Sequence, residues 1–273
     1  MDVKIFVCFH NKEIPLLGEG LCPIYVGNEQ IHSGTIIQDC EGENIHEKNP
    51  RYGELTALYW IWKNYKGKEN IGLCHYRRYF IDPSDNVYLP YQWNRNRLNQ
   101  NKSRVISVVK KWNSNTDILL PKAVALLNSV ESEYVKYHNG QDLILMRSIL
   151  GELYPEYLPS WDKFLAGNKM YLYNMFLTKP EVLNNYCNWL FELLFRFDEL
   201  DKVIRPNAYQ ARIDGFLAER LLNVFVMHHA LRIQENPVVF IGEKNKYRII
   251  VLQNFQNRIK NFLFWIIDVI KSK

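Results

Sequence analysis

Short apolar runs alternate with amphipathic segments along the first part of the chain. Residues 4–10 and 71–74 are apolar runs of strand length, and each is followed by polar residues. Between them, an Asn-Pro pair at residues 49–50 precedes a helical repeat of apolar residues over 55–62. A strand, a long loop, a helix and a second strand in this order predict an α/β fold with a largely parallel sheet.

The rest of the chain continues this pattern. Apolar runs predict strands over residues 23–26, 117–120, 171–178 and 238–241. Amphipathic segments predict helices over residues 141–153, 180–197 and 208–229. We therefore expect residues 1–253 to form one domain.

Residues 82–116 interrupt the pattern because they are polar and rich in asparagine. Their basic side chains include Arg95, Arg97, Lys102 and Arg104. This composition predicts a solvated surface loop, and a mobile lid over a binding site is the alternative.

The C-terminal segment, residues 254–273, has a broad apolar arc flanked by lysine and arginine. It is predicted to be a separate amphipathic helix. A helix of this kind lies in the headgroup layer of an anionic membrane, docks on the core, or forms an oligomer contact.

Composition narrows the function classes. Thirty-four Lys and Arg against 29 Asp and Glu give a net charge of +5, whereas nucleic-acid binders usually have a stronger and clustered positive charge. The five cysteines form no CxxC or Cys/His cluster, which argues against a zinc site and a disulfide framework. The N-terminus lacks the features of a signal peptide, and no apolar run approaches the ~20 residues of a spanning helix. We expect a cytoplasmic protein, dissolved or peripheral on the cytoplasmic face of the membrane.

The densest polar cluster, His75-Tyr76-Arg77-Arg78, follows the predicted strand 71–74 directly. Ligands of open α/β sheets bind beyond the carboxyl ends of the strands, so this is where a site is expected. Two guanidinium groups there could bind a diphosphate in bidentate fashion. If the chain stays extended, His75 and Arg77 face one side and Tyr76 and Arg78 the other. The alternative is a pair of structural arginines in salt bridges.

A second cluster lies in the predicted helix 208–229. Arg212 and Glu219 are seven residues apart and therefore lie nearly on one line of that helix, with Gly215 between them. A carboxylate so placed is a candidate general base. Asp214 and Arg220 point to other sides of the helix, and the alternative is an exposed helix face with ion pairs.

Further polar residues are candidate contacts for a substrate. One group lies in the loop that leads into the predicted helix, and the other on or beside the predicted strand 171–178. These candidates are Asn44, Glu47, Lys48, Asn49, Glu54, Lys169 and Asn174.

Four of these segments, in order, resemble a known family. The segments are residues 42–64, 71–80, 171–195 and 209–225. The family consists of glycosyltransferases of bacterial capsule, exopolysaccharide and O-antigen synthesis, long described as a domain of unknown function. Its members have been identified as galactofuranosyltransferases.

The resemblance implies a Rossmann-type glycosyltransferase domain related to the GT-A architecture. It implies UDP-galactofuranose as donor and a glycan on a polyprenyl-diphosphate lipid as acceptor, with inversion at the anomeric carbon. On chemistry and placement, we assign the base to Glu219, with Asp214 as the alternative. We assign the contacts with the donor and its diphosphate to His75, Tyr76, Arg77, Arg78, Arg212 and Arg220.

Other functions stay open at this point. No Asp-x-Asp pair occurs in the chain, so a requirement for Mn²⁺ or Mg²⁺ is not settled and no metal ligand is assigned. The alternatives are a transferase for another UDP-hexose and a non-catalytic module that binds nucleotide sugars. RNA binding through the basic loop 82–116 is a third alternative.

Overall fold

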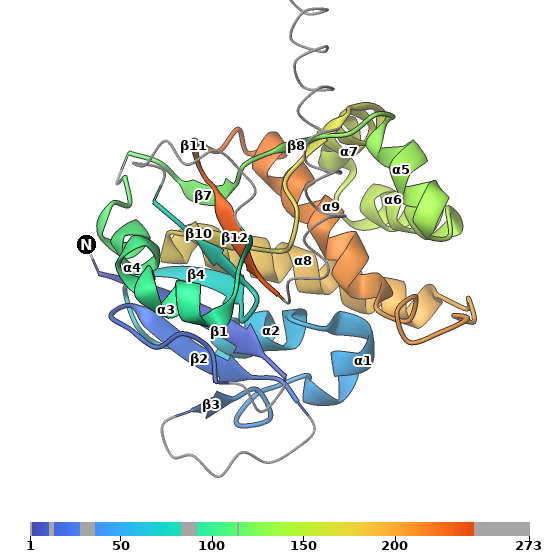
Figure 1. Ribbon diagram of the computed structural model, residues 1–273. Helices are drawn as coiled ribbons and strands as arrows, with labels where there is room; N and C mark the ends of the chain where they lie inside the picture. The colour runs from blue at the N-terminus through green and yellow to red at the C-terminus, as the bar shows by residue number, and fades with distance from the viewer. Residues whose placement is uncertain (1, 11–13, 28–35, 83–91, 114, 243–273) are drawn as a thin grey trace, which may run out of the picture.

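The computed structural model describes residues 2–10, 14–27, 36–82, 92–113 and 115–242 (Figure 1). The predicted C-terminal helix over 254–273 lies outside these residues. Within the described part, no helix combines the length and the apolar character needed to cross a membrane.

A mixed ten-stranded sheet forms the centre of the fold. The order of its main path is β11 (Ile233–Asn236), β7 (Ile118–Pro121), β10 (Phe176–Thr178), β4 (Asn70–His75), β1 (Val3–Phe9), β2 (Leu21–Tyr25) and β3 (Ile37–Gln38). Off this path lie β5 (Arg78–Phe80), β12 (Val238–Ile241) and β6 (Gln92–Trp93). A separate two-stranded sheet pairs β8 (Val124–Ala125) with β9 (Lys169–Met170).

The predicted α/β class is confirmed, and the sheet is mostly parallel along this path. Strands β4, β1, β2 and β3 run parallel to one another, and β11 runs parallel to β7. Strand β10 lies between β4 and β7 and is antiparallel to both. The carboxyl ends of β4, β1, β2 and β3 therefore meet at one edge of the sheet, because parallel strands end on the same side.

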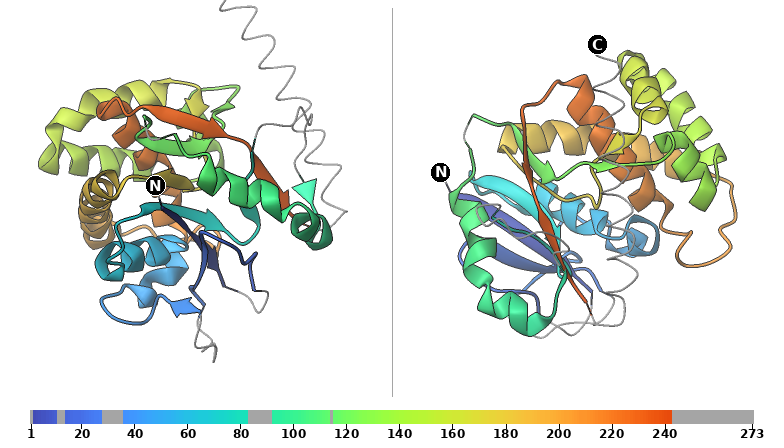
Figure 2. Two further views of the ribbon diagram at one scale, coloured as in Figure 1. Left: turned by 90° about the vertical axis from the view of Figure 1, so that its left-hand side faces the viewer. Right: turned by 45° about the horizontal axis from the view of Figure 1, so that its top comes forward.

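Helices cover both faces of the sheet (Figure 2). On one face, buried residues of the sheet pack against α1 (Asn49–Tyr52), α2 (Leu55–Asn64), α5 (Val130–Tyr137), α6 (Gln141–Leu153), α7 (Leu158–Ala166), α8 (Pro180–Leu200) and α9 (Ile213–His228). On the other face lie α3 (Arg95–Gln100) and α4 (Lys102–Lys110). Short 3₁₀ helices precede α1 and α7, at η1 (His46–Lys48) and η2 (Pro155–Tyr157).

Alternation along β1 shows how one strand serves both cores. Phe6 and Cys8 are buried among the residues packed on α2, α8 and α9, whereas Ile5 and Val7 are buried toward α3 and α4. A strand covered on both faces reads as a continuous apolar run. This is why residues 4–10 are visible as a strand in the sequence.

Three predictions about elements are corrected by the structure. Residues 95–110 are not a solvated loop but two helices, whose Leu98, Val105 and Val108 are buried against the sheet. Only Phe176–Thr178 of the predicted strand 171–178 is a strand. The helix predicted from residue 208 begins at Ile213.

Candidate functional site

The polar residues after β4 form a tight hairpin at the carboxyl edge of the sheet. The chain reverses at Tyr76 and Arg77, and β5 returns antiparallel, so that His75 pairs with Arg78. The expectation of an extended segment is therefore wrong, since the reversal places His75 and Arg78 side by side. Arg77 is left exposed at the turn.

Residues 171–175 form the second wall of this site. Tyr173 has a φ of 82° and Asn174 a φ of 48°, so both adopt a left-handed conformation that side chains disfavour. His75 holds this turn by donating from Nε2 to the carbonyl oxygen of Tyr173, at 2.6 Å. Strained backbone held by its surroundings is common at functional sites.

Asn174 ties the turn to two other elements. Its Nδ2 donates to Glu54 Oε1 at 2.8 Å and to the carbonyl oxygen of Gly215 at 3.0 Å. Its Oδ1 is buried and accepts no hydrogen bond within the described residues. Asn174 therefore positions Glu54 against the start of α9.

The junction between α1 and α2 supplies Glu54, Arg212 directly precedes α9, and Glu219 lies in the first half of that helix. Arg212 Nη2 lies 3.0 Å from Glu54 Oε2. Glu219 Oε1 accepts a hydrogen bond from the backbone N–H of Tyr173 at 3.0 Å. The residues that these contacts bring together, which we call the edge cluster, are Glu54, His75, Arg78, Tyr173, Asn174, Arg212 and Glu219.

Gly53 makes the contact between Arg212 and Glu54 sterically feasible. Its φ of 56° and ψ of −126° suit glycine alone. A Cβ atom at this position would lie 2.7 Å from Arg212 Nη2.

We expect Gly53→Ala to destabilise the fold by about 1–3 kcal/mol, because alanine strains this backbone conformation and displaces the Arg212 guanidinium. Gly151→Ala on α6 is the matched control, since its Cβ would meet Leu158 at an ordinary 3.7 Å. That control should stabilise by about 0.4–1 kcal/mol. Urea unfolding measures both, and equal shifts in the two variants would contradict the assignment.

The charges of the edge cluster follow from its contacts. Burial opposes ionisation of Glu54, but His75, Arg212 and the hydrogen bond from Asn174 bring its pKa below the ordinary value. Burial lowers the pKa of His75, with the Glu54 charge opposing this effect and the Arg78 charge adding to it. Glu54 is accordingly a carboxylate, and His75 carries a proton on Nε2, which it donates to the Tyr173 carbonyl oxygen.

Glu219 differs from Glu54 in proton affinity. Burial raises its pKa above the ordinary value, with the nearby Glu54 charge adding to the effect and Arg220 opposing it. Arg220 Nη1 lies 3.2 Å from Glu219 Oε2, and the Glu219 side chain is 20% exposed. A partly accessible carboxylate with raised proton affinity suits a general base.

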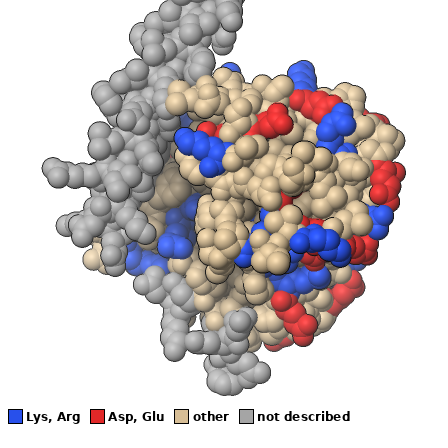
Figure 3. All heavy atoms as spheres, turned by 90° about the vertical axis from the view of Figure 1, so that its right-hand side faces the viewer, with Lys and Arg blue, Asp and Glu red and all other residues tan. Residues whose placement is uncertain are grey.

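Three arginines give this edge of the sheet a positive surface. Neither Arg77 nor Arg78 forms an ion pair with a carboxylate of the described residues; Arg77 lies over the Tyr76 ring and Arg78 over the Tyr173 ring. The Arg212 side chain is 47% exposed although it contacts Glu54. Figure 3 shows Lys and Arg side chains beside a hollow on the face to the right in Figure 1. The arrangement suits an anionic ligand.

Asp214 lies in another cluster. It is fully buried, and its Oδ2 is 2.8 Å from Arg51 Nε, which also lies 2.9 Å from Asp198 Oδ1. Arg51 Nη2 contacts Asp201 at 3.2 Å. Burial raises the pKa of Asp214 to about 7, with Asp198 and Asp201 acting in the same direction against Arg51. The structure thus separates the two acids that the sequence offered as bases.

The raised pKa of Asp214 predicts how the free energy of unfolding depends on pH. Folded Asp214 keeps its proton up to pH about 7, whereas the unfolded chain releases it near 3.8. Between these values the folded state binds more protons, so this group's contribution to stability falls as pH rises, by at most about 1.4 kcal/mol per pH unit. Asp214→Asn cannot titrate and should lack this fall. Urea unfolding at pH about 5, 6, 7 and 8 measures it, and parallel curves for the two proteins would contradict it.

The other candidates from the sequence lie outside the edge cluster. Asn44 stabilises its own turn through Cys40 and Gly42. Lys48 pairs with Asp198, and Asn49 bonds to Gly53 and Thr56. Glu47 is exposed in η1, Lys169 is exposed in β9, and Tyr76 and Arg220 border the cluster.

Two residues of the site region went unnoticed in the sequence. His10 follows β1 at the same edge, and its Nε2 lies 3.4 Å from the Tyr76 hydroxyl. Burial and then the Arg77 charge lower its pKa. The rule that selected His75, a polar residue at a strand's carboxyl end, would also have selected His10. No sequence pattern pointed to Tyr173, because the residues around it do not indicate that its backbone is left-handed.

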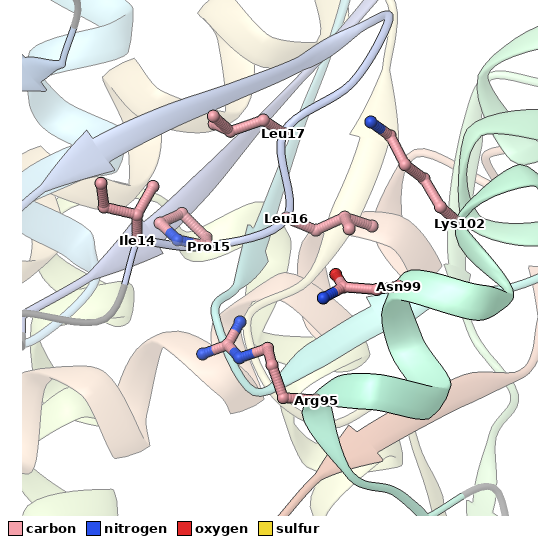
Figure 4. Close-up of a pocket in the computed structure, with 7 residues that line it drawn as sticks. All are labelled: Ile14, Pro15, Leu16, Leu17, Arg95, Asn99 and Lys102. Carbon is pink, nitrogen blue, oxygen red and sulfur yellow. The ribbon is translucent and has the colours of Figure 1, made fainter.

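Two cavities lie outside the edge cluster. The one in Figure 4, near α3 and α4, is lined by Ile14, Pro15, Leu16, Leu17, Arg95, Asn99 and Lys102. A larger groove of about 1000 Å³ lies between α7, the last turns of α9, and strands β8, β9 and β11. Among the described residues, no three His, Cys, Asp or Glu side chains are grouped to hold a metal ion.

Comparisons with known proteins agree with this fold. A family model described as a domain of unknown function (DUF4422) matches residues 4–230. No curated protein matches the chain. The apo structure of the bifunctional glycosyltransferase WbbM superposes with a TM-score of 0.81 at 25% sequence identity. The superposition covers 89% of this chain and 46% of that protein, so the chain spans about half its length.

Proposed function

This chain belongs to the DUF4422 family, and from that premise we propose that it is a glycosyltransferase that uses a nucleoside-diphosphate sugar. The likeness to a bifunctional glycosyltransferase supports the reaction class. The observation that carries the proposal is the edge cluster, in which Arg78, which has no carboxylate partner among the described residues, and the half-exposed Arg212 lie near Glu219, a carboxylate of raised proton affinity.

The proposed reaction is a single displacement. Glu219 takes the proton from an acceptor hydroxyl, whose oxygen forms a bond to the anomeric carbon of the donor sugar. The bond from that carbon to the diphosphate oxygen breaks, and its electron pair leaves with the nucleotide. Arg77 and Arg78 stabilise the charge that develops on the diphosphate. Attack opposite the leaving group inverts the anomeric configuration.

The ion pair of buried Glu54 and half-exposed Arg212 positions these groups rather than reacting. Glu54 holds Asn174 and Arg212, and the turn carrying Asn174 in turn presents the Tyr173 N–H to Glu219. The exposed part of Arg212 gives a third cation for the donor. In this proposal Asp214 stabilises the fold and takes no part in the displacement.

We propose UDP-galactofuranose as the donor and a glycan on a polyprenyl-diphosphate lipid as the acceptor, in the synthesis of a bacterial surface polysaccharide. The enzyme would then act at the cytoplasmic face of the membrane. These finer assignments rest on the resemblance of residues 42–64, 71–80, 171–195 and 209–225 to galactofuranosyltransferases.

A thermal-shift series tests the proposal, with UDP, UDP-galactofuranose, UDP-galactopyranose and UDP-glucose, each with and without Mn²⁺. A ligand at about 100 times its Kd adds about 2.7 kcal/mol to stability. We expect stabilisation by UDP, largest with UDP-galactofuranose, and the Mn²⁺ arm shows whether a divalent ion adds to the arginines. No shift with any uridine nucleotide would refute the proposal. Binding without transfer or hydrolysis would instead identify a non-catalytic module.

A further inference from the structure

The groove of about 1000 Å³ continues the face of α9 that carries the candidate base. Arg212, Gly215, Glu219, Asn223 and Met227 follow one another at intervals of three or four residues, so they form one stripe along the helix. Arg212 and Glu219 belong to the edge cluster, whereas Asn223 and Met227 line the groove. The groove and the edge cluster are therefore neighbours on one helix surface.

Asn223 connects the groove to the edge cluster through its hydrogen bonds. Its Oδ1 accepts from the backbone N–H of Tyr171 at 2.8 Å, and its Nδ2 donates to the carbonyl oxygens of Tyr171 and Glu219. Tyr171 lines the groove, and two residues later Tyr173 contacts the Glu219 carboxylate. Four residues along a helix advance it by about 6 Å, so the groove begins about one sugar ring away from Glu219.

The lining of the groove combines ring faces with polar groups at the rim. Tyr171 is half-buried and supplies aromatic surface, and its hydroxyl donates to Glu235. Lys163 and Lys169 are exposed there, and within the described part of the chain neither has a carboxylate partner. Apolar walls with a few polar groups that fix orientation are typical of sites for organic ligands.

We propose that this groove binds the oligosaccharide chain of the acceptor, with its terminal hydroxyl at Glu219 and the preceding sugars extending toward Met227. The inference rests on the proposed transferase function and adds the location of the second substrate. Hydroxyl-rich or acidic sugars suit the exposed Lys163 and Lys169, and a pyranose face suits the Tyr171 ring. Lys169, outside the edge cluster, has a role in this arrangement.

The test is the dependence of transfer on acceptor length. The probes are octyl β-galactosides of one, two and three sugar units, with UDP-galactofuranose as donor. With the unsubstituted protein, we expect the KM for the acceptor to fall about tenfold as the acceptor lengthens from one sugar unit to three. The reason is that the longer glycan fills the groove. In Met227→Trp, which places bulk in the groove, KM should no longer depend on length, while the Kd for UDP stays the same. Ile144→Trp, at an exposed position of α6, is the matched control and should keep the length dependence.

A second variant adds no bulk. Lys169→Ala should raise KM for the trisaccharide about tenfold with little effect on the monosaccharide. Two results would overturn the proposal. One is a KM that does not depend on acceptor length in the unsubstituted protein, and the other is an unchanged length dependence in both groove variants.

Failure of the proposed function has a different signature, namely no binding of UDP and no transfer to any acceptor. Saturation-transfer NMR with the trisaccharide alone then tests the groove directly. A signal that is lost in Met227→Trp and kept in Ile144→Trp would support glycan binding in the groove. The absence of any signal with the unsubstituted protein would overturn the proposed glycan site.

Discussion

Glu219→Gln should lower the transfer rate by about 10²–10⁴-fold while UDP still binds, because a positioned general base contributes that much and takes no part in holding the nucleotide. The amide keeps the size of the side chain and an oxygen for the Tyr173 N–H. It cannot accept the proton of the acceptor hydroxyl. Initial rates of UDP release with saturating acceptor, together with the Kd for UDP, measure the two effects separately.

The pH dependence provides an independent readout for Glu219. Only the carboxylate accepts a proton, so kcat/KM of the natural enzyme should rise with pH through the raised pKa of Glu219. The Gln variant should lack this acidic limb. Glu152→Gln is the matched control, because Glu152 also pairs with an arginine, Arg196, but at the surface. Full activity of Glu219→Gln would remove Glu219 from the mechanism and direct attention to Glu54.

Arg78→Ala should lower kcat by about 10²–10³-fold, because a preorganised donor aimed at developing charge is commonly worth that much. Arg78 has no carboxylate partner among the described residues and lies 4.8 Å from the Tyr173 ring centroid. Arg78→Lys should recover only part of the loss, because an ammonium group lacks the planar fork of a guanidinium. Steady-state kinetics of the three proteins tests this order.

Nucleotide affinities distinguish a diphosphate contact from a structural one. Loss of Arg78 should weaken UDP binding and leave uridine binding unchanged, since only UDP carries the diphosphate charge. Arg147→Ala, which removes an exposed pair with Asp162, is the control and should change neither affinity. Equal losses for UDP and uridine would show that Arg78 supports the fold through its ring contact instead.

The candidate site was predictable in outline, because its position follows from a local pattern. The buried run that ends at His75 is visible in the sequence, and polar residues after such a strand occupy the sheet edge where ligands bind. Four of the seven edge-cluster residues, His75, Arg78, Arg212 and Glu219, come from the two motifs singled out first. The contacts between distant members of the cluster were not predictable. Arg212 and Glu54, for example, are 158 positions apart in the sequence.

Helices and strands with a regular repeat of apolar residues were also predictable. The helix Gln141–Leu153 and the strand Val238–Ile241 agree with the expectation at both ends, because burial on one or both faces leaves a regular apolar pattern. Residues 95–110 show the limit of the method. Their polar composition suggested a loop, yet a few buried side chains such as Leu98 and Val105 suffice to dock two short helices.

The sequence by itself determined the α/β class, most of the buried strands and long helices, and the sheet edge where arginines and carboxylates gather, since each depends on residues close together in the chain. Tertiary structure decided the antiparallel insertion of β10, the reversal at Tyr76 and Arg77, and the left-handed turn at Tyr173. It also decided which acid faces the site, since Asp214 is held by Arg51 from α1 and Glu219 by the Tyr173 N–H. These outcomes depend on contacts between distant segments, and a local pattern carries no information about which distant group will be the partner.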